Sequence, residues 1–516
     1  MKTKRFILTI DQGTTFTKTF LFDNHLDVAA GNTARHSQIN PQAGWVEHDG
    51  REILDMTIAS IRATMKNASV KSSEIAAIGI SNQGETVIAW DATTGKPLYN
   101  AIVWQDRRTA KVCDELRSDS AFARQVREKT GLFVDPYFSA TKLQWLMEHV
   151  PAISRAARKK NILMGTMDSW LVWNLSRRKA FVTDHSTASR TMLFNLKTLR
   201  WDSGLLSAFN IKQNWLPDVR PSKGVCGVLS PSLVGGEIPI TALLCDQQAA
   251  LMGHGCLRAG QAKCTYGTGA FFLLNVGDTF TRPGNGLLTS IAWSTDKGVQ
   301  YMYDGGVHSA GSAVDWLRDG LGIVRDTSET DTLASSVDST GGLAFVPALT
   351  GLASPYWDST VRGCFLGLNS RTSRAHIARA VLEGIAFRVR DVFEAMNSSW
   401  PRKISSLYVD GGLTQNRFLM EFQADILGIP LKLPRMSEST SLGVAYLAGS
   451  AINFWKDKKI LQKKNVIRKV YVPQISKTER DRKYQKWKNA VAAAATYSRS
   501  NSIRLQNSLL IHSGRF

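Results

Sequence analysis

The chain has 516 residues, a formal net charge of +21 and a hydrophobic fraction of 43%. This length exceeds what one hydrophobic core usually supports, so two or more domains are expected. The sequence contains no apolar run of about 18 residues, which argues against a transmembrane helix, and the apolar patch after the basic N-terminus is too short for a signal peptide. The six cysteines are scattered without a CxxC pair, which favours reduced thiols in a cytoplasmic protein.

The positive charge is concentrated at the C-terminus. From Lys456 onward the chain has 16 Lys or Arg and 3 acidic residues, a net charge of +13. A basic end can bind nucleic acid or anionic lipid, but a solvated helical face followed by a frayed tail is the simpler interpretation, because nucleic-acid motifs and interleaved aromatic residues are missing. We therefore expect no nucleic-acid partner, and we expect residues 497–516 to form a disordered basic tail.

The first predicted elements are two strands joined by a tight polar turn. Apolar runs lead into and out of residues 11–18, which read DQGTTFTK. Gly13 lets the backbone close against a ligand. The amides and hydroxyls of Thr14 and Thr15 can donate to phosphate oxygens, and Asp11 could hold a magnesium ion through water. An ordinary hairpin with a polar turn is the alternative for this motif taken alone.

Further strands and helices follow along the first half of the chain. The apolar patterns predict strands at 28–35, 75–80, 86–90 and 101–104 and helices at 49–67, 109–130 and 140–159. The buried strand at 75–80 delivers a polar stretch that contains Glu85. Such polar ends of central strands are where α/β proteins place their ligands.

The second half, from about residue 250, repeats the opening pattern. A strand at 242–245 ends in Asp246, and residues 263–274 form a second strand–turn–strand built on Gly-Thr-Gly at 267–269. A later strand runs into the glycine-rich turn 410–412, with a helix after it. The repeated hairpin predicts an ancient duplication, in which two similar α/β domains face across a cleft and clamp a nucleotide between phosphate-binding turns.

Together these motifs resemble the FGGY family of carbohydrate kinases, in particular its glycerol kinases, over residues 5 to 490. The matching motifs lie at 11–15, 41–49, 100–105, 135–139, 246–251, 266–269, 350–358 and 410–412. The resemblance implies an α/β fold of two duplicated actin/hexokinase-like (ribonuclease H-like) ATPase domains, at 1–251 and 252–496. The implied activity is ATP-dependent phosphorylation of glycerol to sn-glycerol 3-phosphate with Mg²⁺, in a cytoplasmic homodimer or homotetramer.

The resemblance also implies roles for individual residues. Asp246 matches the catalytic base, and Asp11 matches the carboxylate associated with the metal. The matching substrate-binding positions are Gly84, Glu85, Trp104, Tyr137, Asp246, Gln247 and Phe271. The matching nucleotide-binding positions are Thr14, Thr15, Phe16, Lys18, Thr268, Gly311, Asp315, Gly412 and Asn416. The residue types fit these roles, because a polyol needs carboxylate and amide acceptors for its hydroxyls and an apolar wall for its carbon edge.

Three positions depart from the family pattern. Glycerol kinases usually read Asn-Gln-Arg-Glu-Thr where this chain has NQGET, so Gly84 replaces an arginine that donates hydrogen bonds to glycerol. The basic loop that binds fructose 1,6-bisphosphate in enterobacterial members has Glu237 here, which would repel a phosphate. Their zinc-binding surface glutamate appears as Ser476. We therefore expect this chain to be insensitive to fructose 1,6-bisphosphate.

The departure at Gly84 leaves alternatives open. The first is a kinase for another small polyol or ketose, which would use extra room left by the missing arginine. The second is a catalytically weak scaffold or regulator, against which the presence of both Asp11 and Asp246 argues.

Overall fold

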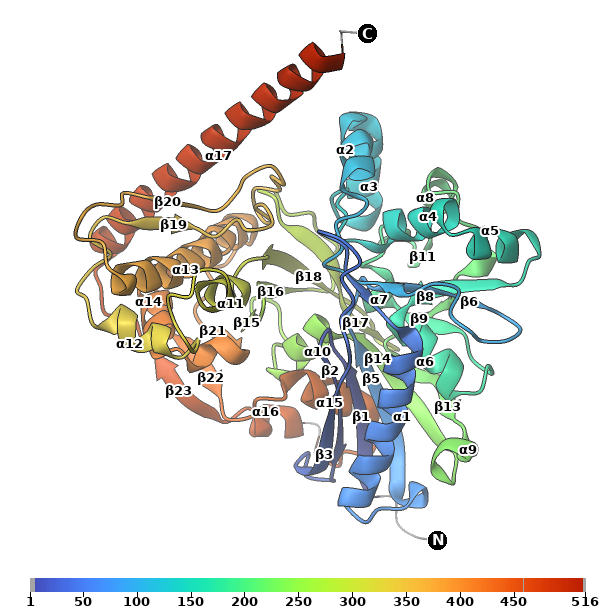
Figure 1. Ribbon diagram of the computed structural model, residues 1–516. Helices are drawn as coiled ribbons and strands as arrows, with labels where there is room; N and C mark the ends of the chain where they lie inside the picture. Colours follow the sequence, from blue (N-terminus) through green and yellow to red (C-terminus); the bar gives the residue numbers. More distant parts are fainter. Residues whose placement is uncertain (1–4, 458, 514–516) are drawn as a thin grey trace.

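Two β-sheets organise the chain in the computed structural model, which describes residues 5–457 and 459–513, with side chains to residue 500 (Figure 1). The first sheet has the strand order β13 (Lys223–Leu229), β14 (Ile238–Cys245), β5 (Ile75–Asn82), β1 (Phe6–Gln12), β2 (Phe16–Phe22) and β3 (Val28–Arg35). The second has the order β17 (Leu288–Thr295), β18 (Gly298–Val307), β16 (Ala270–Gly277), β15 (Ala262–Tyr266), β21 (Leu407–Asp410), β22 (Leu431–Pro434) and β23 (Ile467–Tyr471).

Six strands have the same spatial arrangement in both sheets. Each contains three adjacent antiparallel strands, β1–β2–β3 in the first and β15–β16–β18 in the second, where β17 adds a further edge strand beside β18. Two parallel strands follow, β5 and β14 or β21 and β22, and an antiparallel strand, β13 or β23, pairs with the last of them. The predicted α/β fold of two similar domains is confirmed. The predicted division after residue 251 falls inside α10 (Asp246–Gly253) and stays a prediction.

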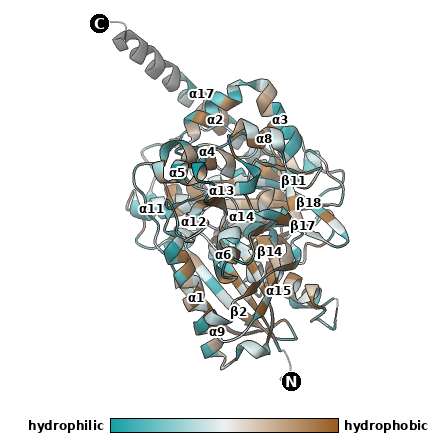
Figure 2. Ribbon diagram, turned by 90° about the vertical axis from the view of Figure 1, so that its right-hand side faces the viewer, coloured by the Kyte–Doolittle hydropathy of each residue, from teal (hydrophilic) through white to brown (hydrophobic). Residues whose placement is uncertain are grey.

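Close backbone approach holds helices against the first sheet. All eight residues of β5 are buried, and α15 (Ser439–Ala451) crosses from the second half of the chain to pack on this sheet. A Cβ at Gly79 of β5 would lie 2.7 Å from the carbonyl oxygen of Val444 in α15. Only glycine permits this approach, so the packing of α15 beneath the site depends on Gly79. Figure 2 shows apolar colouring on β14, the neighbour of β5 in this sheet.

A smaller sheet and a helical layer extend the first half. The sheet has the order β4 (Glu47–His48), β7 (Ala101–Ile102), β6 (Val87–Asp91) and β8 (Ile162–Thr166). The predicted helices at 109–130 and 140–159 are each divided in two, as α2 (Ala110–Ser118), α3 (Ser120–Thr130), α4 (Ser139–His149) and α5 (Pro151–Arg158). The Asp119 carboxylate accepts from the amides of Ala121 and Phe122 and so begins α3. Pro151 occupies the first position of α5, which ends the preceding helix.

The longest helices are α1 (Gly50–Asn67), α13 (Arg374–Ser399) and α17 (Lys477–Ser513). In the structure α17 continues to Ser513 and leaves the body of the protein (Figure 1), and the disorder expected from residue 497 stays a prediction. A run of alanines at 492–495, which favours helix, carries the chain into this region. Residues 514–516 of the predicted tail lie outside the described residues.

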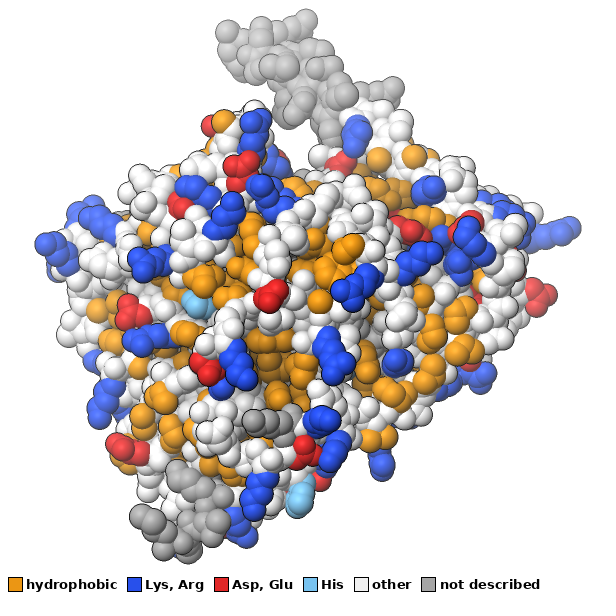
Figure 3. Space-filling model, turned by 180° about the vertical axis from the view of Figure 1, so that it is seen from behind, with side chains coloured by type: hydrophobic (Ala, Val, Ile, Leu, Met, Phe, Trp, Pro, Cys, Tyr) orange, Lys and Arg blue, Asp and Glu red, His pale blue; other side chains and the backbone are white. Residues whose placement is uncertain are grey.

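The remaining short elements complete the two halves. They are η1 (Ser72–Glu74), α6 (Met167–Leu175), β9 (Val182–Asp184), α7 (His185–Ala188), β10 (Phe194–Asn195), β11 (Arg200–Trp201), α8 (Ser203–Ala208), η2 (Gln213–Trp215), β12 (Asp218–Arg220), α9 (Pro231–Val234), α11 (Gly311–Asp319), α12 (Glu329–Ser335), β19 (Ala344–Val346), β20 (Cys364–Leu366), η3 (Gly412–Gln415), α14 (Arg417–Leu427) and α16 (Ile460–Lys464). Within the described part of the chain, no helix has the length and apolar character needed to cross a membrane. On the face seen in Figure 3, Lys and Arg side chains are scattered rather than gathered into one stripe.

Candidate active site

The turn between β1 and β2 brings several predicted phosphate-binding residues together. The Gly13 amide donates to the Phe16 carbonyl at 3.0 Å, which closes the turn. The Thr14 hydroxyl accepts from the Trp104 indole at 2.8 Å and thereby joins this turn to the predicted polyol pocket. Thr15 is exposed, and Phe16 is 40% exposed. The backbone of this turn is therefore open to a ligand at Thr15 and Phe16.

Asp11 lies at the end of β1, beside this turn. It pairs in register with Lys18 of β2 and with Ser81 of β5, whose hydroxyl donates to Asp11 Oδ1 at 2.9 Å. Burial raises the pKa of Asp11 to about 6, against the lowering effects of Ser81 and Lys18. Nearby protein cations therefore do not fully compensate this carboxylate.

Lys18 is held by a residue that sequence reasoning missed. Its ammonium donates to Glu438 Oε2 at 2.9 Å. Glu438 directly precedes α15, and 420 residues separate the two partners in the sequence. No local pattern could have indicated this pair. It moderates the positive charge that Lys18 offers to a phosphate.

Asp246, the predicted base, begins α10 at the end of β14. Burial, together with the negative charges of Glu85 and Asp11, raises the pKa of its carboxyl to about 7. The backbone amide of Gln247 donates to Asp246 Oδ1 at 2.6 Å and favours the ionised form of the carboxyl group. A carboxyl with this pKa can accept a proton at neutral pH, as a general base requires.

A buried lysine fixes the neighbouring amide. The Lys263 ammonium, from β15, donates to Gln247 Oε1 at 2.6 Å and to Thr265 Oγ1 at 2.7 Å. Burial lowers the pKa of Lys263, and the charges of Asp410 and Asp246 oppose that shift. The sequence placed Lys263 in a strand without a role. Its bond uses the side-chain carbonyl oxygen of Gln247, so the Gln247 NH₂ group remains able to donate to another acceptor.

Three aromatic side chains meet as predicted. The ring centroid of Trp104 lies 5.7 Å from that of Tyr137 and 6.0 Å from that of Phe271, both at nearly perpendicular planes. Trp104 and Tyr137 belong to the first half of the chain and Phe271 to the second. Edge-to-face packing of this kind makes a rigid apolar wall, against which the carbon edge of a small polyol can lie.

The position of the missing arginine is filled. A Cβ added to Gly84 would lie 2.5 Å from Cys245 Sγ and 3.4 Å from Arg190 Cγ. The prediction of extra room at Gly84 is therefore wrong, because Cys245 and Arg190 occupy the space into which a side chain at this position would point. Arg190, which sequence reasoning missed, donates from Nε to Glu85 Oε1 at 2.7 Å. Its Nη1 lies 2.8 Å from Ser290 Oγ and 2.9 Å from Asp304 Oδ2 in the second half of the chain.

Glycine-rich turns of the second half also converge. The Gly311 amide donates to the Gly267 carbonyl at 2.9 Å, and the amides of Ala310 and Ser312 each donate to the Thr268 carbonyl at 3.0 Å. These bonds fix the turn between β15 and β16 against the start of α11. A Cβ at Gly411 would collide with the Tyr266 backbone, so the turn that leads to Gly412 also meets this hairpin.

Two predicted nucleotide-site residues make other contacts. Asn416 accepts from the Leu419 amide at 2.8 Å as the N-cap of α14, and its NH₂ group donates to Thr330 Oγ1 at 3.1 Å. Asp315 pairs with Arg318 at 3.4 Å one turn along α11. Both sit next to glycine-rich turns, Asn416 after Gly412 and Asp315 after Gly311. Their roles toward a nucleotide stay predictions.

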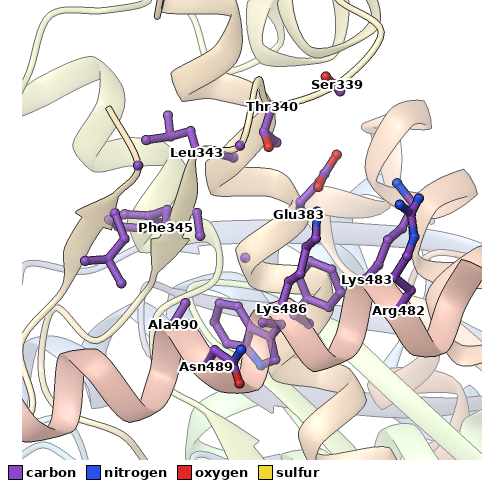
Figure 4. Close-up of a pocket in the computed structure, with 18 residues that line it drawn as sticks. Ser339, Thr340, Leu343, Phe345, Glu383, Arg482, Lys483, Lys486, Asn489 and Ala490 are labelled. Carbon is purple, nitrogen blue, oxygen red and sulfur yellow. The ribbon is translucent and has the colours of Figure 1, made fainter. Parts of the chain in front are cut away.

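A cavity of about 600 Å³ lies elsewhere, between α13, α17 and the β19–β20 hairpin (Figure 4). Phe345, Phe387 and Trp487 form part of its lining, and Glu383 and Lys486 also line it. None of its lining residues belongs to the predicted site. The chemistry argued from the sequence therefore concerns a different part of the molecule.

Comparisons with known proteins agree with this arrangement. The N-terminal domain of the FGGY family of carbohydrate kinases matches residues 6–253, and its C-terminal domain matches residues 262–452. The chain is 46% identical to a glycerol kinase of Alkaliphilus oremlandii, over 97% of this chain and 99% of that protein. It is also 46% identical to glycerol kinase 2 of Thermotoga maritima, over 95% of this chain and 98% of that protein.

Two solved structures have the same fold. A crystal structure of Plasmodium falciparum glycerol kinase with ADP superimposes with a TM-score of 0.87 at 34% identity, over 95% of this chain and 98% of that chain. A ligand-bound xylulose kinase from Lactobacillus acidophilus gives a TM-score of 0.83 at 25% identity, over 95% of this chain and 98% of that chain.

Proposed function

The chain belongs to the FGGY family of carbohydrate kinases, and from this premise we propose that it transfers the γ-phosphoryl group of ATP to a terminal hydroxyl of glycerol, giving sn-glycerol 3-phosphate. The observation that carries the proposal is the 46% identity to a glycerol kinase over 97% of the chain. The xylulose kinase, at 25% identity, is a more distant relative. The substrate class therefore follows the glycerol kinases.

We assign the role of general base to Asp246. Phosphoryl transfer needs positioning and charge neutralisation more than covalent help from the protein. Asp246 removes the proton from the attacking hydroxyl, which its pKa of about 7 supports. Glu85, fixed by Arg190, and Gln247, fixed by Lys263, accept from or donate to the remaining hydroxyls.

The wall of Trp104, Tyr137 and Phe271 excludes water from the carbon side of the substrate. A longer polyol or ketose was the alternative because of Gly84. Cys245 and Arg190 fill the space beside Gly84, so no observation favours the alternative.

ATP is the phosphoryl donor in this proposal, and the two glycine-threonine turns bind its phosphates. Asp11 fits an association with Mg²⁺, because its raised pKa marks a buried carboxylate that a cation would stabilise. Among the described residues there is no group of three or more His, Cys, Asp or Glu side chains that could hold a metal ion. One carboxylate together with substrate phosphates is how proteins usually bind Mg²⁺, which neutralises charge on the transferred group.

The test is an ATP-dependent phosphorylation assay with glycerol, four-carbon polyols and xylulose as acceptors, with and without Mg²⁺. We expect glycerol to give the highest kcat/KM and its phosphate to be the product. Preference for a tetritol or xylulose contradicts the assignment of glycerol as the substrate. If no acceptor is phosphorylated, the scaffold alternative is favoured. A homodimer or homotetramer and a cytoplasmic location stay predictions.

A further inference from the structure

Gly84 and Cys245 are packed so tightly that they constrain one another. A Cβ at position 84 would approach Cys245 Sγ to 2.5 Å, which is closer than real Cβ contacts allow. Cys245 is 2% exposed, and its amide donates to Ser186 Oγ at 2.9 Å. It also pairs in register with Asn82 of β5. Because the backbone at Cys245 is fixed in this way, it cannot retreat cheaply from a larger residue at position 84.

The Cys245 thiol also reaches the reacting centre. Its Sγ lies 3.7 Å from Asp246 Oδ1, in the geometry of a weak hydrogen bond to the proposed base. Burial raises the pKa of Cys245 well above its ordinary value, and the charges of Asp246 and Glu85 raise it further. The group that fills this part of the pocket is therefore a neutral thiol rather than a cation.

Arg190 does not replace the missing donor. Its guanidinium is already committed to Glu85, Ser290 and Asp304, at 2.7–2.9 Å. Its side chain is 3% exposed, so these bonds are sheltered from water. Releasing it toward a substrate would leave two buried carboxylates uncompensated, which is strongly unfavourable.

We propose that Gly84 and Cys245 form a coupled pair that determines substrate specificity. The thiol leaves no room for a side chain at position 84, so one hydroxyl of the substrate is bound without a charged donor. This inference rests on the proposed function and deepens it. A site that hydrogen-bonds a hydroxyl through a buried donor rejects analogues that lack the hydroxyl, because the donor is then left unpaired. A pocket without that donor accepts three-carbon diols, propane-1,2-diol or propane-1,3-diol, beside glycerol.

The test is a double-mutant cycle with Gly84→Arg, Cys245→Gly and the combined variant. Gly84→Arg alone should lower kcat/KM for glycerol more than tenfold and lower the melting temperature, because its Cβ collides with the thiol. The combined variant should recover both. Its preference for glycerol over at least one of the two diols should exceed that of the wild type by about 10–100-fold, the value of a hydrogen bond to a charged donor.

Two controls separate coupling from general damage. Cys256→Gly removes another buried thiol, away from position 84, and should not rescue Gly84→Arg. If Gly84→Arg does not fold, Gly84→Ala with and without Cys245→Gly tests the same collision, because alanine supplies the Cβ. Melting temperatures that change additively in this cycle overturn the coupling.

The kinetic outcomes separate the pair from the proposed function. An active enzyme whose ratio of glycerol to diol is the same in the wild type and the combined variant overturns the specificity role of the pair alone. A wild type that phosphorylates neither glycerol nor either diol overturns the proposed function. The melting temperatures need no substrate, so they report the packing of position 84 in either case.

Discussion

The hairpins β1–β2 and β15–β16 hold equivalent places in the two sheets, but the acidic residue near each hairpin lies on a different strand. In the first, Asp11 lies on the hairpin strand β1 and pairs in register with Ser81 of β5. In the second, the corresponding hairpin residue is Thr265, and its register partner on β21 is the acid Asp410. The carboxylate has thus changed strands between the two halves.

The surroundings of the two acids differ as much as their positions. Burial raises the pKa of Asp11 to about 6. Burial would also raise the pKa of Asp410, but His254 and Lys263 outweigh it and hold that pKa far below the usual range. His254 Nε2 lies 2.8 Å from Asp410 Oδ2, which also accepts from the Ser439 hydroxyl. Asp410 is compensated by the protein, whereas the raised pKa of Asp11 indicates that its neighbours do not fully compensate its charge.

The comparison shows what duplication preserves and what it does not. The strand order and the glycine turns are common to both halves because they depend on backbone geometry. Charge compensation depends on single side chains from distant parts of the chain, so the two halves are free to diverge. We therefore expect the acid of the first half to serve the reaction and the acid of the second half to serve the fold.

The largest expected effect comes from Asp246, which lies between the two hairpins. Asp246→Asn should lower kcat by about 10²–10⁴-fold, because the attacking hydroxyl loses its proton acceptor. ATP binding should persist. Steady-state kinetics with glycerol and an ATP-binding titration measure both quantities.

A folding defect can be separated from this loss. Because the folded-state pKa of Asp246 is raised to about 7, its ionised form opposes folding at pH values above the usual carboxyl pKa, and increasingly up to pH 7. The asparagine variant should therefore melt at the same temperature as the wild type or higher at pH 8. More than a third of wild-type turnover in this variant contradicts the role of base.

Asp410→Asn should reduce stability rather than chemistry. Removing one partner of a buried, hydrogen-bonded ion pair costs about 3–5 kcal/mol of unfolding free energy. The pKa of Asp410 is lowered on folding, so this stabilisation is present at pH values above the usual carboxyl pKa and is lost as the pH falls through the lowered value. Denaturant unfolding at pH 7 measures the loss, and Asp319→Asn, in an exposed pair with Arg318, should leave stability nearly unchanged.

The pH dependence of catalysis should follow the acids near the first hairpin. Protonated Asp246 cannot accept a proton, so kcat/KM should fall about tenfold per pH unit below pH 7. The raised pKa of Asp11 adds a second loss below about pH 6, where its affinity for a cation weakens. A profile that stays flat down to pH 5 would show that neither acid titrates in this range.

Asp11→Asn should act on the metal dependence and leave the fold intact. A carboxylate that holds Mg²⁺ through water resembles an outer-shell ligand, whose loss usually lowers metal affinity or activity by about 10–100-fold. A magnesium titration of the rate measures the effect, with Asp23→Asn, in the turn between β2 and β3, as the charge control. Since burial raises the pKa of Asp11, removing its charge should not lower the melting temperature. A fall as large as that of Asp410→Asn would erase the difference between the two halves.

The sequence was informative where structure is local. The strands, the two hairpins and the walls at Trp104 and Phe271 follow from apolar patterns, glycine turns and family motifs. The partners were not predictable, because they are remote in the chain. Arg190 meets Glu85 across 105 residues, and Lys18 meets Glu438 across 420.

The surroundings of Gly84 could not be predicted for the same reason, because the residue that packs against it is remote in the chain. A glycine in place of an arginine suggests open space, and only the tertiary structure shows that Cys245, at the end of β14, fills it.

The smallest expected effect concerns two residues within α17, Ser498 and Arg499, which contact the segment 358–362. Ser498 Oγ accepts from the Arg362 amide at 3.2 Å, and Arg499 Nη2 lies 3.0 Å from Asp358 Oδ2. The Arg499 side chain is 68% exposed, and exposed ion pairs contribute about 0–1 kcal/mol. A chain ending at Tyr497 should therefore keep its kcat and melt within a few degrees of the full protein, with Arg499→Ala as the matched variant. A large fall in either quantity after truncation, without one in Arg499→Ala, would show that Ser498 or a residue after Arg499 also stabilises the second half.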